Sequence, residues 1–280
     1  MTTPTKPTIG VFDSGFGGLT VLRALLPLIP NAHYIYLGDT ARLPYGAKSQ
    51  ATIARYAVES ARFLHQQGAT LLVIACNTAT ALALEDIQAA LPIPVIGVIQ
   101  PGAEAAHLAN PTAPVLVLAT AATVQSHAYT QALTALGLSA TEKACPLLVP
   151  LVEEGWLPGS AAEASAKTAV TLEVLHIYLT EAIAEAGYPQ PTTLLLGCTH
   201  YPLLKPLIEH TLATLHHPMT IIDSAEATAR AVAAHLPAST TTETPTCAFY
   251  ATDSVEKFQR LGSYFLGQPL PEVHLIDLGG

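Results

Sequence analysis

Two cysteines of this chain follow short apolar segments that resemble each other. Cys76 comes after Thr70–Ala75, and Cys198 comes after Thr193–Gly197. The next residues in both places carry amide, hydroxyl or imidazole groups, namely Asn77, Thr78, Thr199 and His200. A lone cysteine often behaves as a small buried hydrophobe, but two in matched settings indicate two thiols that face one cavity from two related halves. Proton transfer on both faces of one carbon atom would need such a pair.

The elements that must position these thiols alternate between strand and helix. Apolar runs of strand length lie at Ile9–Phe12, His33–Leu37, Thr70–Ala75, Pro94–Val98, Pro114–Ala119, Ala144–Val149, Thr192–Gly197 and Thr220–Ile222. Ser49–Gln67 has helical periodicity, with Ser49 as N-cap and Gly68 as the stop. Ala161–Ala186 is a second such stretch, and Gly187 ends it. Continuous apolar strands that alternate with helices predict an α/β fold with parallel sheets covered on both faces.

The strand ends also suggest an internal similarity. Besides the two cysteines, an Asp-Ser pair ends a strand twice, at Asp13-Ser14 and at Asp223-Ser224. We interpret this as a sign of two similar halves, although not of a short tandem repeat. Residues 237–245 read as an exposed loop, and a strand and a helix are expected within Cys247–Phe265.

Composition restricts the classes of function. The chain of 280 residues is long enough for two domains. Pro, His, Asp and Glu interrupt every apolar run before it reaches the length needed to span a membrane. Four cysteines without close pairing favour a reducing compartment, so we expect a soluble cytoplasmic protein. A net charge of −9 without a basic stripe argues against nucleic acid as a partner. An anionic substrate must therefore be held by local features such as helix N-termini and glycine-rich turns.

A glycine-rich segment, residues 13–20, follows the first predicted strand. Gly15 and Gly17 open a helix there, and Asp39 could serve as the ribose-binding acid of a dinucleotide site. However, Thr20 occupies the third glycine position, and Asp13 would repel a pyrophosphate. A tight turn that presents Asp13 and a serine at the ligand-binding edge of the sheet is the better interpretation.

Other chemistries are less well supported. Cys76, Cys198 and His200 could ligate zinc, but a Cys-x-x-Cys pairing and a second suitably spaced histidine are missing. No lysine stands at a comparable strand end, as a pyridoxal enzyme would need. Cys145 and Cys247 lack polar neighbours of the same kind, so buried packing is expected for both.

Four motifs, taken in order, make the chain resemble glutamate racemases, the cofactor-independent enzymes that make D-glutamate for bacterial cell walls. These motifs are Gly10–Val21, Leu37–Gly46, Ala75–Ala79 and Leu196–Leu204. The resemblance covers nearly the whole chain and favours glutamate racemases over the related aspartate and hydantoin racemases.

The resemblance implies roles for particular residues. The catalytic cysteines would be Cys76 and Cys198, with Asp13 assisting the first and Glu153 and His200 the second. Glu154 is adjacent to Glu153, which leaves that assignment open. The substrate contacts would be Asp13, Ser14, Tyr45, Gly46, Asn77, Thr78, Thr199 and His200, with Thr120 and Thr123 as further contacts for a carboxylate. Ala119 departs from the glycine that many members carry before this threonine.

The resemblance also implies an architecture of two similar α/β domains, each a mostly parallel sheet flanked by helices, with the active site in the cleft between them. Residues 1–98 and 211–280 would form the first domain, and residues 99–210 the second. We expect a homodimer that acts on glutamate, needs no cofactor or metal, and binds neither nucleic acid nor membrane.

A two-base mechanism follows from the chemistry of these groups. A thiol with an ordinary pKa of about 8.5 is mostly protonated at neutral pH. A helix that begins just after each cysteine should favour the thiolate. The thiolate removes the Cα proton from one face, and the opposite thiol returns one to the other. The alternatives are a racemase for aspartate or a hydantoin, and an amino-acid-binding sensor that has kept the fold and lost the chemistry. Retention of both thiols speaks against the sensor.

Overall fold

The computed structural model describes residues 6–157, 166–236 and 244–279. The chain divides into two compact units, one made of Met1–Val98 and Ala225–Gly280 and the other of Ile99–Ser224. The boundary expected at residue 210 therefore lies further along, at Ser224. It lies there because α9 (Lys205–Thr214) packs on α8 (Ala166–Ala186) and β8 (Thr220–Asp223) pairs with the strand Thr193–Gly197.

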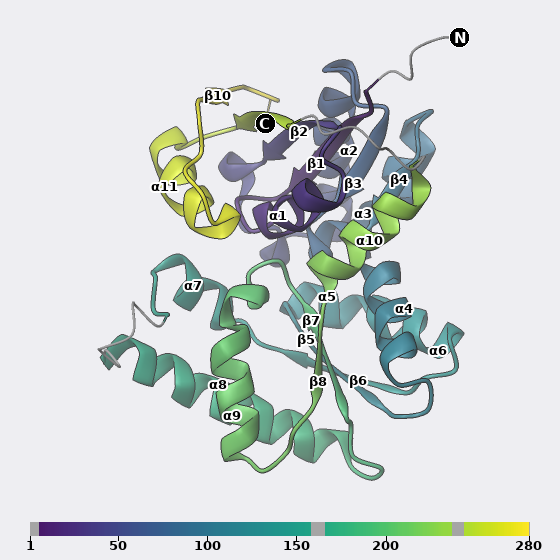
Figure 1. Cartoon of the computed structure of the whole chain (residues 1–280), viewed down its shortest axis with the longest axis vertical. Coiled ribbons are helices and arrows are strands. Elements are labelled where there is room, and N and C mark those ends of the chain that lie inside the picture. Colours follow the sequence, from purple (N-terminus) through teal and green to yellow (C-terminus); the bar gives the residue numbers. More distant parts are fainter. Residues whose placement is uncertain (1–5, 158–165, 237–243, 280) are drawn as a thin grey trace. The chain divides into compact units, whose positions relative to one another are not determined.

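The first unit contains a parallel sheet of six strands in the order β10-β9-β2-β1-β3-β4. Their bounds are β1 Thr8–Asp13, β2 His33–Gly38, β3 Leu71–Ile74, β4 Val95–Gly97, β9 Thr246–Ala251 and β10 Val273–Leu275. The helices are α1 Leu19–Leu28, α2 Gln50–Gln66, α3 Asn77–Ala90, α10 Ser224–His235 and α11 Val255–Leu266. Helix α11, drawn in yellow in Figure 1, packs beside α1, and α2 packs beside α3.

The second unit contains a parallel sheet of four strands in the order β6-β5-β7-β8 (Figure 1). Besides β8, its strands are β5 Val115–Ala119, β6 Ala140–Ala144 and β7 Thr193–Gly197. The remaining helices are α4 Ile99–Ala109, α5 Ala121–Ser126, α6 Ala128–Ala135 and α7 Leu148–Glu153. Three short 3-10 helices complete the described elements, namely η1 Thr40–Arg42, η2 Tyr45–Ala47 and η3 Tyr201–Leu204.

The two sheets share a strand order, which confirms the predicted similarity of the halves. The run β2-β1-β3-β4 in the first unit matches β6-β5-β7-β8 in the second. The strands that precede the two cysteines, β3 and β7, hold the same place in this order. The Asp-Ser pairs do not, because Asp13 ends β1 whereas Asp223 ends β8, the counterpart of β4. The repeated Asp-Ser is therefore not a mark of the internal similarity.

Most predicted strands are confirmed within a residue or two, and the predicted α2 is confirmed with its N-cap. The Ser49 hydroxyl accepts a hydrogen bond from the Thr52 amide, and Gly68 follows with a φ of 101°. Helix α8 ends at Ala186 as predicted, although residues 161–165 of its expected start lie outside the described part. The strand predicted at Ala144–Val149 is wrong.

The reason for that error is visible in the sequence of the actual strand. The strand β6, Ala140–Ala144, is an edge strand with the sequence ATEKA, and all its residues are partly exposed, so it lacks the apolar run of a buried strand. The apolar residues after it belong instead to α7, where Leu148 and Val152 are spaced four apart and both are buried. The edge strand β10 was not predicted at all.

Candidate active site

In the first unit, the residues around Cys76 come from the ends of two neighbouring strands. β1 and β3 pair in parallel, and the Ala75 amide donates a hydrogen bond to the Phe12 carbonyl at 2.8 Å. Asp13 ends β1, and Cys76 follows β3 by two residues. The Ser14 hydroxyl therefore lies 3.4 Å from the Cys76 sulfur. This is the carboxyl edge of a parallel sheet, where ligands bind in open α/β folds.

The electrostatic setting of Cys76 opposes the thiolate. Cys76 is the N-cap of α3, and its sulfur accepts a hydrogen bond from the Ala79 amide at 3.4 Å. Burial and, next, the charge of Asp13 nevertheless raise the pKa of Cys76 to about 11, and the hydrogen bonds from Ser14 and Ala79 offset only part of this. The hydrogen bond from the start of α3 thus favours the thiolate as expected, but burial and the charge of Asp13 outweigh it.

The remaining predicted residues of this half lie close to the thiol. Asn77 and Thr78 are the first residues of α3, and both are buried. Asp13 is also buried, and its carboxylate accepts a hydrogen bond from the Gly15 amide at 2.9 Å. A dinucleotide site would need that amide for a pyrophosphate, so the geometry disfavours this alternative.

Gly18 packs directly against the Cys76 half-site. A Cβ atom at Gly18 would lie 2.6 Å from the Cβ of Asp13 and 2.8 Å from that of Ala75. Only glycine fits here without displacing the backbone that carries Asp13 and Cys76. This close approach, rather than phosphate binding, explains at least this glycine of the glycine-rich segment.

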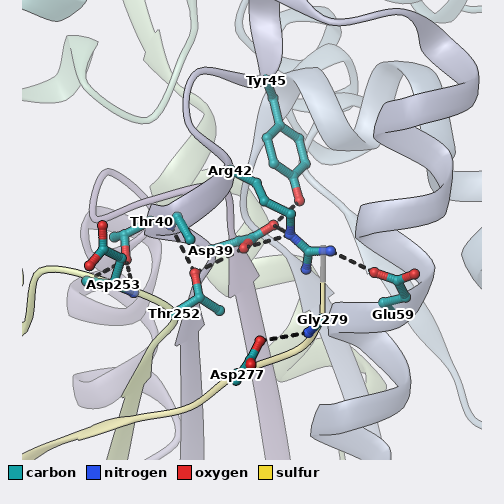
Figure 2. Close-up of polar contacts among 10 residues, drawn as sticks. Asp39, Thr40, Arg42, Tyr45, Glu59, Thr252, Asp253, Asp277 and Gly279 are labelled. Carbon is teal, nitrogen blue, oxygen red and sulfur yellow. Dashed lines mark hydrogen bonds and ion pairs between the residues drawn. The ribbon is translucent and has the colours of Figure 1, made fainter.

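The Tyr45–Gly46 segment lies in η2, between β2 and α2. The Tyr45 side chain points into the core, and its hydroxyl donates a hydrogen bond to the Asp39 carboxylate at 2.5 Å (Figure 2). Gly46 is exposed. The Tyr45 hydroxyl is thus engaged by Asp39, which leaves the backbone of this segment as the group that could contact a substrate.

In the second unit, the residues around Cys198 occupy the corresponding strand ends. Ala119 at the end of β5 pairs with Gly197 at the end of β7, so Thr120 and Cys198 leave the sheet side by side. Thr120 is the N-cap of α5, and its hydroxyl lies 2.9 Å from the hydroxyl of Thr123. A Cβ at Gly197 would approach the Tyr129 ring to 2.8 Å, which again requires glycine.

The turn that contains Cys198 brings an imidazole and a carboxylate together. Cys198, Thr199 and His200 are all buried. His200 Nδ1 lies 3.3 Å from the Thr199 hydroxyl, and its Nε2 lies 3.2 Å from Oε1 of Glu153. This geometry settles which acid lies beside the imidazole, because Glu153 makes the contact.

Two features of this turn differ from the sequence expectation. Glu154, the alternative acid, is the exposed C-cap of α7. In addition, no α-helix begins directly at Cys198, since a turn and the 3-10 helix η3 come before α9. Cys198 therefore lacks the N-cap position that Cys76 holds.

Three further residues hold the half-sites in place and were missed as such. Tyr201 is buried, and its hydroxyl donates to the Cys145 carbonyl at 3.0 Å, which anchors the turn after Cys198. Asp39 and Arg42 hold the Tyr45 segment. All three lie inside the motifs Leu37–Gly46 and Leu196–Leu204, and only their place in these motifs could have identified them from the sequence.

Cys145 and Cys247 lie outside the two predicted half-sites and differ in how deeply they are buried. Cys145 is fully buried as predicted, and burial raises its pKa to about 12. Cys247 is only partly buried, contrary to the prediction, and burial raises its pKa to about 11. None of the four cysteines forms a disulfide in the described structure.

No group of three or more His, Cys, Asp or Glu side chains in residues 6–157, 166–236 and 244–279 is arranged to hold a metal ion. In the same ranges, every helix is too short or too polar to cross a lipid bilayer.

Comparisons with known proteins agree on one family. The family model described as Asp/Glu/Hydantoin racemase matches residues 10–232. A glutamate racemase of Koribacter versatilis is 49% identical over 300 residues, which cover 98% of this chain and 99% of the relative. A crystal structure of glutamate racemase from Francisella tularensis in complex with D-glutamate has a TM-score of 0.83 at 35% identity, and 98% of each chain is covered. The Thermus thermophilus glutamate racemase, solved with β-chloro-D-alanine, has a TM-score of 0.81 at 40% identity, again with 98% of each chain covered.

Proposed function

This chain belongs to the Asp/Glu/Hydantoin racemase family of amino acid racemases, and we propose that it interconverts L- and D-glutamate by proton transfer at Cα. The observation that carries the proposal is the matched placement of two buried thiols. Cys76 and Cys198 follow equivalent strands of two sheets with the same strand order. Three relatives that are 49%, 43% and 42% identical to this chain are glutamate racemases, which supports glutamate as the substrate.

The reaction uses the two thiols as an acid and a base on opposite faces of one carbon atom. In one direction, the Cys76 thiolate takes the Cα proton and becomes a thiol. The Cys198 thiol then donates its own proton to the other face and becomes the thiolate. Proton exchange of the two thiols with solvent then restores the first state, so the proton count of enzyme and substrate balances over each turnover in one direction.

Each thiol has a different partner for its proton. Cys76 has a pKa of about 11 before substrate binds, so it must lose a proton to act as the base. Asp13, whose charge already acts on this thiol, is the group that receives or steers that proton. On the other side, His200 performs this role for Cys198, and Glu153 holds the imidazole through its 3.2 Å contact.

The charges of glutamate are met by local donors rather than by the overall charge, since the protein carries −9. The groups that we assign to substrate binding are Ser14, Asn77, Thr78, Thr120, Thr123, Thr199 and the backbone of Tyr45 and Gly46. Hydroxyls and backbone N–H groups take up carboxylate charge as the carbanion develops. No step in this sequence requires a cofactor.

The direct test is incubation of the purified protein with L-glutamate in D2O, followed by chiral chromatography and mass spectrometry. We expect D-glutamate that carries deuterium at Cα, with activity retained after dialysis against a chelator. Faster turnover of aspartate than of glutamate would overturn the substrate assignment. Activity that returns only with an added cofactor would overturn the mechanism.

We further propose that the D-glutamate supplies peptidoglycan synthesis in the cytoplasm and that the enzyme is a homodimer. The support for both is the family resemblance. Depletion of the protein in its host should produce a requirement for external D-glutamate, and light scattering on the purified protein should give twice the mass of 29.3 kDa.

A further inference from the structure

A buried carboxylate organises the segment between β2 and α2. Asp39 follows β2 directly and has no exposed surface. Its Oδ2 accepts from Arg42 Nε at 2.8 Å and from the Tyr45 hydroxyl at 2.5 Å. Its Oδ1 accepts from Arg42 Nε at 3.0 Å and from the Thr252 hydroxyl at 3.0 Å. Figure 2 shows these side chains converging on Asp39.

The positive charge that balances Asp39 is that of Arg42, whose guanidinium also contacts Glu59 and Tyr56. Arg42 is 8% exposed, and its Nη1 donates to Glu59 at 2.5 Å. Its guanidinium lies 4.2 Å from the ring centroid of Tyr56. Because an unbalanced buried charge is costly, Asp39 and Arg42 each require the other, and the contacts with Glu59 and Tyr56 define the guanidinium's orientation.

A distant part of the sequence closes the same network. Thr252, which follows β9, accepts a hydrogen bond from the Ala41 amide at 2.9 Å in addition to its bond to Asp39. Its neighbour Asp253 exchanges backbone hydrogen bonds of 2.6 and 2.9 Å with the Thr40 hydroxyl. The segment between β2 and α2 is therefore hydrogen-bonded at Thr40 and Ala41 to residues 252–253, and at Tyr45 to Asp39.

These contacts leave no role for the network in proton transfer itself. Both Asp39 oxygens already accept hydrogen bonds, and the Tyr45 hydroxyl is used by one of them. We propose that Asp39, Arg42 and Thr252 are positioning residues that hold the Tyr45–Gly46 backbone ready for glutamate and thereby set its affinity. This inference rests on the proposed function, because it takes this backbone as a substrate contact. Pre-ordering a binding segment removes part of the entropy cost of binding.

The test uses variants that keep the fold. Thr252→Val has nearly the shape of threonine but cannot bond Asp39, and Tyr45→Phe removes only the hydroxyl. For both variants we expect KM for glutamate to rise about three- to tenfold with kcat within about twofold, because binding shared by ground and transition states is lost. The dissociation constant for D-glutamate, measured by calorimetry, should rise in parallel. Thr252→Ser, which keeps the hydroxyl, should restore both values.

The matched control is Thr246→Val. Thr246 is the first residue of β9, the strand that Thr252 follows, and its hydroxyl lies 2.8 Å from Nδ1 of His33. This variant should leave KM and the dissociation constant unchanged. Unchanged KM in Thr252→Val and Tyr45→Phe, with or without a lower Tm, would overturn the positioning role, as would a loss of kcat at constant KM. If the unaltered protein neither racemises nor binds glutamate, the proposed function fails instead, and this inference fails with it.

Discussion

His200 Nε2 lies 3.2 Å from Oε1 of Glu153, so the imidazole next to Cys198 has a carboxylate on its far side. Cys76, at the equivalent strand end, has the Ser14 hydroxyl 3.4 Å from its sulfur and the charge of Asp13 acting on it. The two half-sites therefore share a backbone plan but differ in the groups that handle protons.

Glu153→Gln should reduce kcat for racemisation. The amide retains a hydrogen-bonding group but loses the carboxylate charge that holds the His200 imidazole, and a hydrogen bond to a charged group contributes about 1.5–3 kcal/mol. We expect a loss of about ten- to a hundredfold. Glu154→Gln is the matched control, since Glu154 is the exposed neighbour, and it should keep full activity. Equal losses in the two variants would contradict the assignment.

Cys76→Ser and Cys198→Ser should each nearly abolish racemisation, because a serine hydroxyl is a far weaker acid and base partner at neutral pH. The two directions should lose kcat/KM equally, since neither enantiomer is favoured at equilibrium. Cys247→Ser should remain active, and Cys145→Ser should remain active per folded molecule with a lower Tm, because it buries a hydroxyl. Near-normal turnover in either of the first two variants would falsify the two-base mechanism.

Alkylation of Cys76 should rise with pH towards a midpoint near the pKa of about 11, well above that of an ordinary thiol. The anionic Asp13 contributes to this rise because it disfavours a second negative charge nearby. Asp13→Asn should therefore move the midpoint down and speed alkylation at pH 8, while racemisation falls. Peptide mass spectrometry with iodoacetamide at several pH values measures the midpoint. A midpoint that stays the same or moves up in Asp13→Asn would rule out this electrostatic role.

Gly18→Ala should reduce both activity and Tm. Its new Cβ would lie 2.6 Å from the Cβ of Asp13, so the backbone of the Cys76 half-site must move. Gly102→Ala provides the comparison, because a Cβ there meets its nearest neighbour at an ordinary 3.5 Å. Chiral assays and thermal unfolding of both variants test the point, and full activity of Gly18→Ala would show that the half-site tolerates the shift.

Thr78→Val should raise KM for glutamate about tenfold while the fold persists, because a buried hydroxyl assigned to the substrate is replaced by a methyl group of similar size. Thr70→Val is a suitable control, since Thr70 is an exposed residue whose hydroxyl donates a hydrogen bond to the Thr8 carbonyl of the neighbouring strand. An unaltered KM in Thr78→Val would remove Thr78 from the substrate site.

Much of this protein could be predicted from sequence because its central strands are buried on both faces. Residues 71–74 and 193–197 are wholly buried, and such strands must be continuously apolar, which makes them readable without an alignment. The cysteines that follow them were identified from the same pattern. By contrast, β6 is a partly exposed edge strand, so its polar sequence carried no such signal and the prediction fell on the residues of α7.

Tertiary structure alone decided the finer properties of the site. Adjacent acids cannot be told apart by spacing, and the end of α7 directs Glu153 to His200 while Glu154 faces solvent. Sequence placed Cys76 before a helix, yet its pKa depends on burial and on Asp13, which comes from another strand. Likewise, the Tyr45 hydroxyl donates to the carboxylate of Asp39, which Arg42 and Thr252 also bind. Asp39 and Thr252 are 213 residues apart in the sequence, so only the fold brings them together. The periodicity of a sequence indicates which residues of an element are buried. The pKa values and hydrogen bonds of those residues depend on side chains from other segments, which only the tertiary structure places beside them.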